Sequence, residues 1–278
     1  MSTPGAAPRG TTVRDHRRRA LDHEREPLPT RVEETPGLPA AYNDALEHGL
    51  ARLGIELDAG ARVAIAGHAR LLGAWSGAMN LSGLRGPARV ATGHVVDSLT
   101  ALPVLRVRRI RRLLDLGSGA GYPGLPLSIA LPAERALLVD SIGKRVRFMA
   151  TVVAATGVGD RVEAVVARAE DLAADEAHRE RWQAVLARAV GPLSELAELA
   201  LPLLEPGGLL VAWKRGEIAD ELAAASRALT GLGGGSIEWV DTSLDGLLAG
   251  HRLVLLTKAG PTPRTFPRDP AVRRRRPW

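Results

Sequence analysis

The sequence contains no cysteine, and this absence removes several kinds of chemistry. Without a thiol, the chain forms no disulfide, holds no thiolate-bound metal and uses no cysteine nucleophile. Histidine and carboxylate residues do not cluster at the spacing of metal ligands either. The sequence therefore predicts a protein without a metal site.

Aromatic residues and long apolar runs are also scarce. The 278 residues include two Phe, two Tyr and five Trp, too few for stacking bases along an extended single strand. Glycine and proline interrupt the uncharged residues 116–133, so we expect no membrane-spanning helix. The N-terminus has no apolar signal-peptide core, and the expected location is the cytoplasm.

Positive charge is concentrated at the C-terminus. The formal net charge is +6, and residues 258–278 alone hold seven basic residues against one acidic residue. Arginines in such a tail can pair with phosphates and displace the counterions of a nucleic acid. Arg264 and Arg268 are therefore candidate nucleic-acid-binding residues, and the prolines around them argue against a helix. A solvated, unstructured terminus explains the last few residues equally well.

Composition divides the chain into four segments. Residues 1–38 contain five prolines and almost no large apolar residues, which is typical of a disordered extension. Residues 39–105 regain apolar residues at helical spacing and predict an N-terminal helical cap, with one helix over 88–105. Residues 106–260 carry the pattern of the core, and residues 261–278 form the basic tail.

Within the core, short apolar strands alternate with helices. Such alternation predicts a mainly parallel α/β sheet. The last two strands, 236–240 and 251–259, have no helical pattern between them, so we expect an antiparallel hairpin at one edge. The other predicted elements are strand 113–116, helix 126–130, strand 135–140, helix 144–157, strand 161–167, strand 182–188, helix 193–204, strand 207–214 and helix 217–233.

The stretch DLGSGAGYPG, residues 115–124, joins the first strand to the first helix. Its glycines allow positive φ angles and let a ligand approach backbone N–H groups at the start of a helix. Asp140 ends the second strand, where a carboxylate can bond the hydroxyls of a ribose. These features predict a nucleotide-like cofactor, and the glycines alone leave a dinucleotide and S-adenosylmethionine both open.

The charge in front of the loop favours one of these two cofactors. Asp115 precedes the glycines, and a carboxylate there attracts a cation more than a pyrophosphate. S-adenosylmethionine carries a sulfonium and an ammonium group. The stretch EPGG at 205–208 and the closing hairpin are also typical of class I methyltransferases. We therefore predict a Rossmann-like class I methyltransferase fold that binds S-adenosylmethionine.

Five stretches together resemble the RsmG (GidB) family, which methylates guanine N7 in 16S ribosomal RNA. The resemblance covers about residues 40–260 and is most specific in DSIGKRVRF at 140–148. It implies an enzyme whose partner is 16S ribosomal RNA or the small ribosomal subunit, and we expect a monomer. The stretches are NLSG (80–83), HVVDSL (94–99), LLDLGSGAGYPGLPLSIA (113–130), DSIGKRVRFM (140–149) and LARAVGPL (186–193).

The resemblance implies roles for residues around the cofactor. Gly117 and Tyr122 would contact it, and Asp140 would lie near its ribose. Ala169 and Glu170 would bracket the adenine with a backbone N–H and a carboxylate. With the residues that the loop itself indicates, the predicted cofactor set is Asp115, Gly117, Gly119, Tyr122, Asp140, Ala169, Glu170 and Arg188.

Three residues are predicted to take part in methyl transfer. Arg188 ends the fourth strand and, by the resemblance, faces the transfer site. Asn80 could line that site or cap the following turn. His94 could touch the cofactor pocket or RNA, and an equally good alternative is a buried structural pair with Asp97, one helical turn away. The family usually has a basic residue where this chain has Gly93.

A second basic group lies after the second strand. Lys144, Arg145 and Arg147 begin a predicted helix, where the helix dipole disfavours cations. A phosphate partner would offset that cost. These three residues therefore join Arg264 and Arg268 as predicted RNA-binding residues.

The chain lacks the residues that methylation at other base positions commonly needs, and this is consistent with transfer to guanine N7. Cytosine C5 methylation generally uses a cysteine, and exocyclic amines commonly need an Asn/Asp-Pro-Pro-Tyr-like stretch where this chain reads ARAVGPL. N7 has a free lone pair, so in-line attack on the sulfonium methyl needs alignment but no general base. Two alternatives remain open: a methyltransferase acting on another RNA or a small molecule, and a non-catalytic RNA-binding assembly protein.

Overall fold

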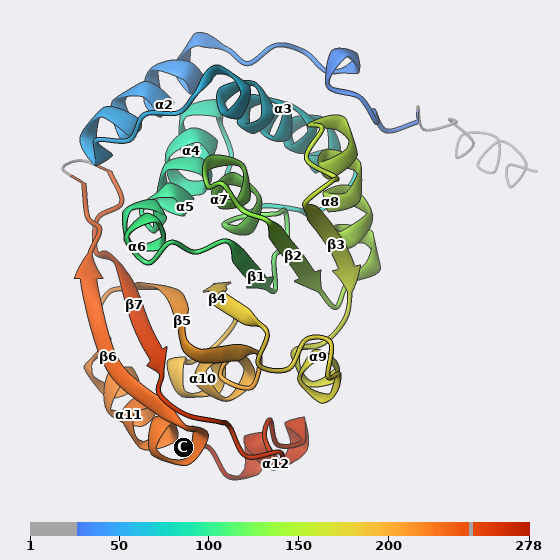
Figure 1. Cartoon of the computed structure of the whole chain (residues 1–278). Coiled ribbons are helices and arrows are strands. Elements are labelled where there is room, and N and C mark those ends of the chain that lie inside the picture. Colours follow the sequence, from blue (N-terminus) through green and yellow to red (C-terminus); the bar gives the residue numbers. More distant parts are fainter. Residues whose placement is uncertain (1–26, 245–246) are drawn as a thin grey trace, which may run out of the picture.

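The protein is built around one seven-stranded sheet. The computed structural model describes residues 27–244 and 247–278, so residues 1–26 of the predicted extension lie outside the described residues. The strand order is β3-β2-β1-β4-β5-β7-β6 (Figure 1). The strands are β1 (Arg112–Leu116), β2 (Arg135–Asp140), β3 (Val162–Val166), β4 (Trp182–Arg188), β5 (Leu204–Arg215), β6 (Gly234–Asp241) and β7 (His251–Lys258).

The pairing of these strands confirms the predicted α/β class. Strands β1 to β5 pair in parallel, whereas β7 runs antiparallel to both β5 and β6. The final hairpin folds so that β7 enters the sheet beside β5 and leaves β6 at the edge. A mainly parallel sheet is therefore closed by an antiparallel pair, as the missing helix between the last two strands predicts.

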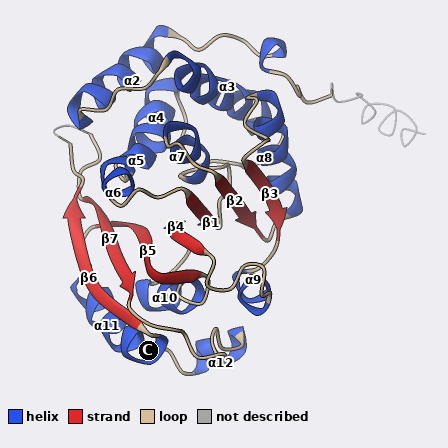
Figure 2. Ribbon diagram, viewed as in Figure 1, coloured by secondary structure: helices blue, strands red, loops and turns tan. Residues whose placement is uncertain are grey.

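Helices cover both faces of the sheet (Figure 2). The main ones are α2 (Ala40–Leu53), α3 (Ala59–Ser76), α7 (Gly124–Ala130), α8 (Gly143–Ala155), α9 (Ala169–Ala174), α10 (Leu193–Ala200) and α11 (Ala219–Leu232). Strand residues alternate between two cores: Leu113 packs with α3, α7 and α8, and Leu114 packs with α10 and α11. In the described part of the chain, no helix is long and apolar enough to cross a membrane.

The single helix predicted over 88–105 is interrupted. It is divided into α4 (Pro87–Val90), a π-helical segment (Ala91–Val96), α5 (Asp97–Leu99) and α6 (Leu102–Val107). Pro103 lies in the first turn of α6, where the missing N–H costs no helical hydrogen bond. The π-helical segment includes Gly93, whose carbonyl accepts a hydrogen bond from Arg188 at 3.2 Å. π-helical turns occur frequently at functional sites.

The disorder predicted for residues 1–38 does not extend to residues 27–38. The Trp75 indole N–H donates to the Pro29 carbonyl at 2.8 Å, and Arg70 donates to the Thr35 carbonyl at 2.5 Å. These donors belong to α3. Hydrogen bonds to backbone carbonyls and the partly buried Leu28, Val32 and Leu38 together hold the segment on the cap, and three scattered apolar residues give no periodic pattern.

The C-terminal tail is folded, which corrects the expectation of a free, non-helical segment. Residues Pro270–Arg275 form α12, with the Asp269 side chain accepting a hydrogen bond from the Ala271 N–H at 2.7 Å. Pro270 is compatible with this helix because it occupies the first turn. Arg264 forms an ion pair with Glu176. The tail lies beside α9 and α10 (Figure 1).

Glu198 on α10 anchors this tail. Its side chain is fully buried and accepts hydrogen bonds from the Arg268 guanidinium at 2.6 Å and from the Trp278 indole at 2.6 Å. Burial acts to raise the pKa of Glu198, but the hydrogen bonds from Arg268 and Trp278 outweigh it and hold the pKa below its usual range. The guanidinium that was predicted to bind RNA is therefore bound inside the protein.

We expect Glu198→Ala to lower the free energy of unfolding by about 3 kcal/mol, because it leaves the half-buried Arg268 without its partner. Since the folded-state pKa of Glu198 is depressed, its contribution is present above the ordinary glutamate pKa and is lost as the pH falls through the depressed value. Urea unfolding across acidic pH measures both effects. Glu217→Ala, at a side chain that is 90% exposed, is the control. Equal stability of the two variants would contradict this account.

Candidate functional site

A cavity of about 360 Å³ lies at the carboxyl ends of β1 to β4. The strand order changes direction at β1, so the loops after β1 and β4 separate there and leave a crevice. Ligands of doubly wound α/β sheets bind at this switch point. The wall consists of Gly117 after β1, Asp140 and Ser141 at β2, residues 167–170 after β3, and residues 189–191 after β4.

The glycine loop after β1 is held by hydrogen bonds to two acids. The Gly119 N–H donates to Asp140 Oδ2 at 3.0 Å. The Gly124 N–H donates to Asp115 Oδ2 at 2.9 Å. Gly117 and Gly119 have φ angles of +69° and +59°, which L side chains rarely adopt. A Cβ on Gly124 would lie 2.6 Å from Asp115, so glycine is required where the helix meets the acid.

Asp115 is fully buried beneath this loop and keeps an unused acceptor. Its Oδ2 atom is bound by Gly124, whereas Oδ1 has no hydrogen-bond partner. Burial raises the pKa of Asp115 to about 7. An unpartnered buried carboxylate oxygen costs free energy and favours a cationic donor. This property fits the positively charged ligand that the sequence predicts.

Asp140 connects the cavity to the helix that follows β2. Its Oδ1 atom accepts from the Ile142 N–H at 2.9 Å, and Oδ2 accepts from Arg145 at 3.2 Å in addition to Gly119. Arg145 also lines the cavity. Arg145 therefore has an internal partner, whereas Lys144 and Arg147, the other two residues predicted on this helix to bind RNA, are exposed.

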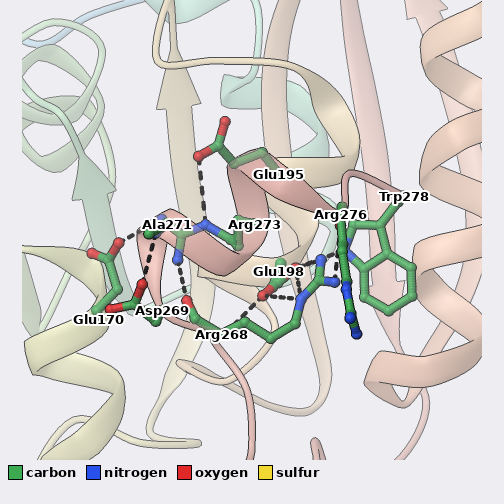
Figure 3. A network of polar contacts seen from close by, with 9 residues as sticks. All are labelled: Glu170, Glu195, Glu198, Arg268, Asp269, Ala271, Arg273, Arg276 and Trp278. Carbon is green, nitrogen blue, oxygen red and sulfur yellow. Dashed lines mark hydrogen bonds and ion pairs between the residues drawn. The ribbon is translucent and has the colours of Figure 1, made fainter.

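Residues after β3 and Arg273 of the tail line the far side of the cavity. Figure 3 shows the polar contacts of Arg273 with its neighbours. Ala169 and Glu170, which were predicted to bracket the adenine, line this side. Glu170 is bound by Arg273 of α12 at 2.5 Å, and Arg273 is also within 3.5 Å of Glu195. The sequence reasoning missed Arg273 and Glu195 because no local pattern pairs residues this far apart. Of the predicted cofactor set, Gly117, Asp140, Ala169 and Glu170 line the cavity, whereas Asp115, Gly119, Tyr122 and Arg188 do not.

A second polar cluster surrounds Arg188 at the end of β4. One guanidinium nitrogen donates to Asp97 Oδ2 at 2.9 Å, and the other contacts His94 Nδ1 at 3.1 Å. Asp97 also accepts from His251 at 2.9 Å through Oδ1, and its carbonyl accepts from the Trp213 indole at 2.8 Å. His94 and Asp97 are therefore joined through Arg188, and sequence reasoning missed His251 and Trp213.

The Arg188 contact decides the protonation of His94. A guanidinium only donates, so His94 Nδ1 accepts and the ring is neutral with its proton on Nε2. That proton is donated to Ser82 Oγ at 2.6 Å. Burial and the charge of Arg188 lower the pKa of His94 to about 3, which agrees with this tautomer. At neutral pH the ring is consequently a poor proton acceptor.

Tyr122 lies between two histidine rings and not on the cavity wall. Its ring stacks on His68 at 4.1 Å and on His94 at 4.6 Å between centroids. It is 4% exposed. Tyr122, which was predicted to contact the cofactor, therefore packs against both histidines, and the Arg188 guanidinium lies 5.9 Å from its ring centroid. Asn80 is exposed, and its side chain makes no hydrogen bond within the described residues.

No group of three His, Cys, Asp or Glu residues in the described ranges is arranged to hold a metal ion. The cavity and the Arg188 cluster lie next to each other. They share β4, because Arg188 ends the strand and the next three residues line the cavity.

We expect Asp97→Ala to lower the free energy of unfolding by about 3 kcal/mol, because the mutation leaves the guanidinium of Arg188 without its buried counterion. Asp97 is 4% exposed in this ion pair and Arg188 is 16% exposed. Chemical denaturation measures the change. The control is Asp44→Ala at an exposed position on α2, which should be nearly neutral. A loss no larger than that of the control would show that the cluster contributes little to stability.

Comparison with known proteins identifies similar chains along most of the sequence. The family model described as rRNA small subunit methyltransferase G matches residues 63–240. The protein named Ribosomal RNA small subunit methyltransferase G from Symbiobacterium thermophilum is 36% identical over 236 residues, which is 84% of this chain and 96% of the relative. The protein of the same name from Pelotomaculum thermopropionicum is 38% identical over 199 residues, 72% of this chain and 83% of the relative.

Solved structures show a similar fold at low sequence identity. An O-methyltransferase from Bacillus cereus in complex with SAH matches with a TM-score of 0.54 and 16% identity, covering 77% of this chain and 97% of that chain. A methyltransferase from Geobacter sulfurreducens matches with a TM-score of 0.50 and 14% identity, covering 81% and 98%. These matches support the predicted class I methyltransferase fold.

Proposed function

The chain belongs to the family of rRNA small subunit methyltransferase G, and on that premise we propose that it transfers a methyl group from S-adenosylmethionine to guanine N7 in 16S ribosomal RNA. The observation that carries the proposal is the buried, unpartnered Oδ1 atom of Asp115 beside the glycine loop. It is an acceptor for the ammonium group of the cofactor. The acceptor RNA is presented as free 16S ribosomal RNA or within the small ribosomal subunit, to one copy of the chain.

Residues at the ends of successive strands fit the parts of this cofactor in order across the sheet. Asp115 of β1, buried beneath the glycine loop and not on the cavity wall, suits the ammonium group. Asp140 at the end of β2 suits the ribose hydroxyls, with Arg145 as the donor they would replace. Ala169 and Glu170 after β3 suit the adenine edge. When bound, the cofactor supplies an electrophilic methyl group on a sulfonium. The protein residues bind it and exclude water from the cavity.

Arg188 is suited to orient the guanine. Its contacts with Asp97, Gly93 and His94 use the two terminal nitrogens and fix the plane of the guanidinium. Remaining N–H groups can donate to guanine O6, a common partner of arginine. N7 then keeps its lone pair, and the neutral, weakly basic His94 is consistent with a reaction that needs no general base. With Arg188 and His94, Asn80 is the third residue that we propose for the methyl-transfer site.

RNA contacts are proposed for exposed cations that have no internal partner in the described structure. Lys144 and Arg147 on α8 meet this criterion. Arg145 and Arg268 do not, because Asp140 and Glu198 bind them. Contacts of this kind would pair with phosphates and would weaken as salt is raised.

Mapping N7-methylguanine across 16S ribosomal RNA tests the proposed function. RNA from cells that lack the protein should miss one N7-methylguanine, and the wild-type chain should restore it. Arg188→Ala should fail to restore it, whereas Arg52→Ala at an exposed position on α2 should succeed. An identical set of N7-methylguanines with and without the protein would overturn the proposal.

Binding of S-adenosylmethionine should weaken as the pH falls below about 7, because the ionised form of Asp115 binds the cation and its pKa is raised to about 7. One coupled proton gives a rise in Kd of about tenfold per pH unit well below that pKa. Calorimetric titration measures the dependence. Asp115→Asn should bind the cofactor weakly, and its Kd should not rise further as the pH falls. A wild-type Kd that stays constant through the same pH range would contradict this role of Asp115.

A further inference from the structure

The wall of the cavity beyond β3 is completed by the last residues of the chain. Figure 3 shows Arg273 extending from α12 toward Glu170 and Glu195. Arg273 is 8% exposed and lines the same cavity as Asp140 and Glu170. Its position is therefore that of an interior residue, although the sequence places it in a run of four arginines at the terminus.

Arg273 joins the two sides of the cavity. It forms an ion pair with Glu170 Oε1 on α9 at 2.5 Å and lies 3.5 Å from Glu195 Oε1 on α10. A further guanidinium nitrogen donates to the Arg268 carbonyl at 2.7 Å. Because α9 follows β3 and α10 follows β4, one side chain connects helices that follow strands on the two sides of the switch point.

The rest of the tail holds Arg273 in place. Arg268 donates to Glu198 from its backbone and its guanidinium, and it also lies over the Trp278 ring at 4.6 Å. The Arg276 carbonyl accepts a third contact from Arg268 at 3.0 Å. These bonds fix both ends of α12, so the guanidinium of Arg273 is positioned before any ligand binds.

We propose that residues 261–278 form part of the cofactor site and that Arg273 is the positioning residue that makes Glu170 selective for adenine. The inference rests on the proposed function. Arg273 holds one carboxylate oxygen of Glu170, and Oε2 makes no hydrogen bond within the described residues. A carboxylate accepts only, and adenine presents an amino donor. Without Arg273, Glu170 and Glu195 would face the cavity as two unpaired carboxylates.

Selectivity between two purines separates this role from a general loss of structure. S-inosylhomocysteine carries a carbonyl at position 6 and a proton on N1, whereas S-adenosylhomocysteine carries an amino group at position 6 and an unprotonated N1. Only S-adenosylhomocysteine therefore offers Glu170 a donor at position 6. Arg273→Gln should raise the Kd of S-adenosylhomocysteine about tenfold and reduce its preference over S-inosylhomocysteine by a similar factor. Arg274→Gln, on the exposed side of the same helix, should change neither value.

A double mutant tests whether Arg273 acts through Glu170. Glu170→Gln alone should lose the same purine preference, and adding Arg273→Gln should then cost little more, because coupled residues are not additive. Additive losses in the double mutant would overturn the proposed route. Arg273→Lys keeps the charge, but an ammonium group cannot contact both carboxylates as a planar guanidinium does. This variant should therefore show an intermediate loss of purine preference, and it serves as the test if Arg273→Gln does not fold.

Calorimetry on the full-length chain gives these affinities. Failure of the wild type to bind S-adenosylhomocysteine would overturn the proposed function itself. Binding by the wild type with the same purine preference in the Arg273 and Arg274 variants would overturn only this inference. The expected result is a preference that depends on Arg273 and Glu170 and is unaffected by Arg274.

Discussion

Two buried carboxylates at the ends of neighbouring strands hold the glycine loop in its binding conformation. Asp140 bonds the N–H of Gly119, and Asp115 bonds the N–H of Gly124. The loop must take positive φ angles to place these N–H groups, and glycine is the residue that adopts them at low cost. The two acids and the glycines therefore act together to fix the conformation of the loop. The cavity exists where it does because parallel pairing brings the two strand ends together.

The end of β4 divides the cavity from the Arg188 cluster. Ala189 has a φ angle of +57°, which is unusual for a residue with a side chain. This backbone turn lets Arg188 bond Asp97 while the following residues, including Val190, line the cavity. A strained residue between a cavity and a buried polar cluster is the kind of position where the local cost in free energy is often retained for function.

Local patterns predicted what depends on neighbouring residues. The strands, the glycine loop and Asp140 follow from alternation, turn chemistry and the position of an acid at a strand end, and the structure contains them within a few residues. Membership of the loop predicts a ligand contact for Tyr122, but it does not predict the stacking of Tyr122 between His68 and His94, which requires the folded cap. The interrupted helix around Gly93 likewise depends on Arg188, a residue from another element.

The arginines of the tail illustrate why composition could not separate internal from external charge. The net charge of +6 equals the excess of residues 258–278, yet Arg268 and Arg273 face carboxylates of α9 and α10. Their partners lie roughly seventy to a hundred residues earlier, a separation that no periodicity records. Exposed positive charge is therefore carried by the remaining cations, such as Lys144 and Arg147. Within the tail, Arg273 forms part of the cavity wall. The exposed Arg274, Arg275 and Arg276 form a basic surface.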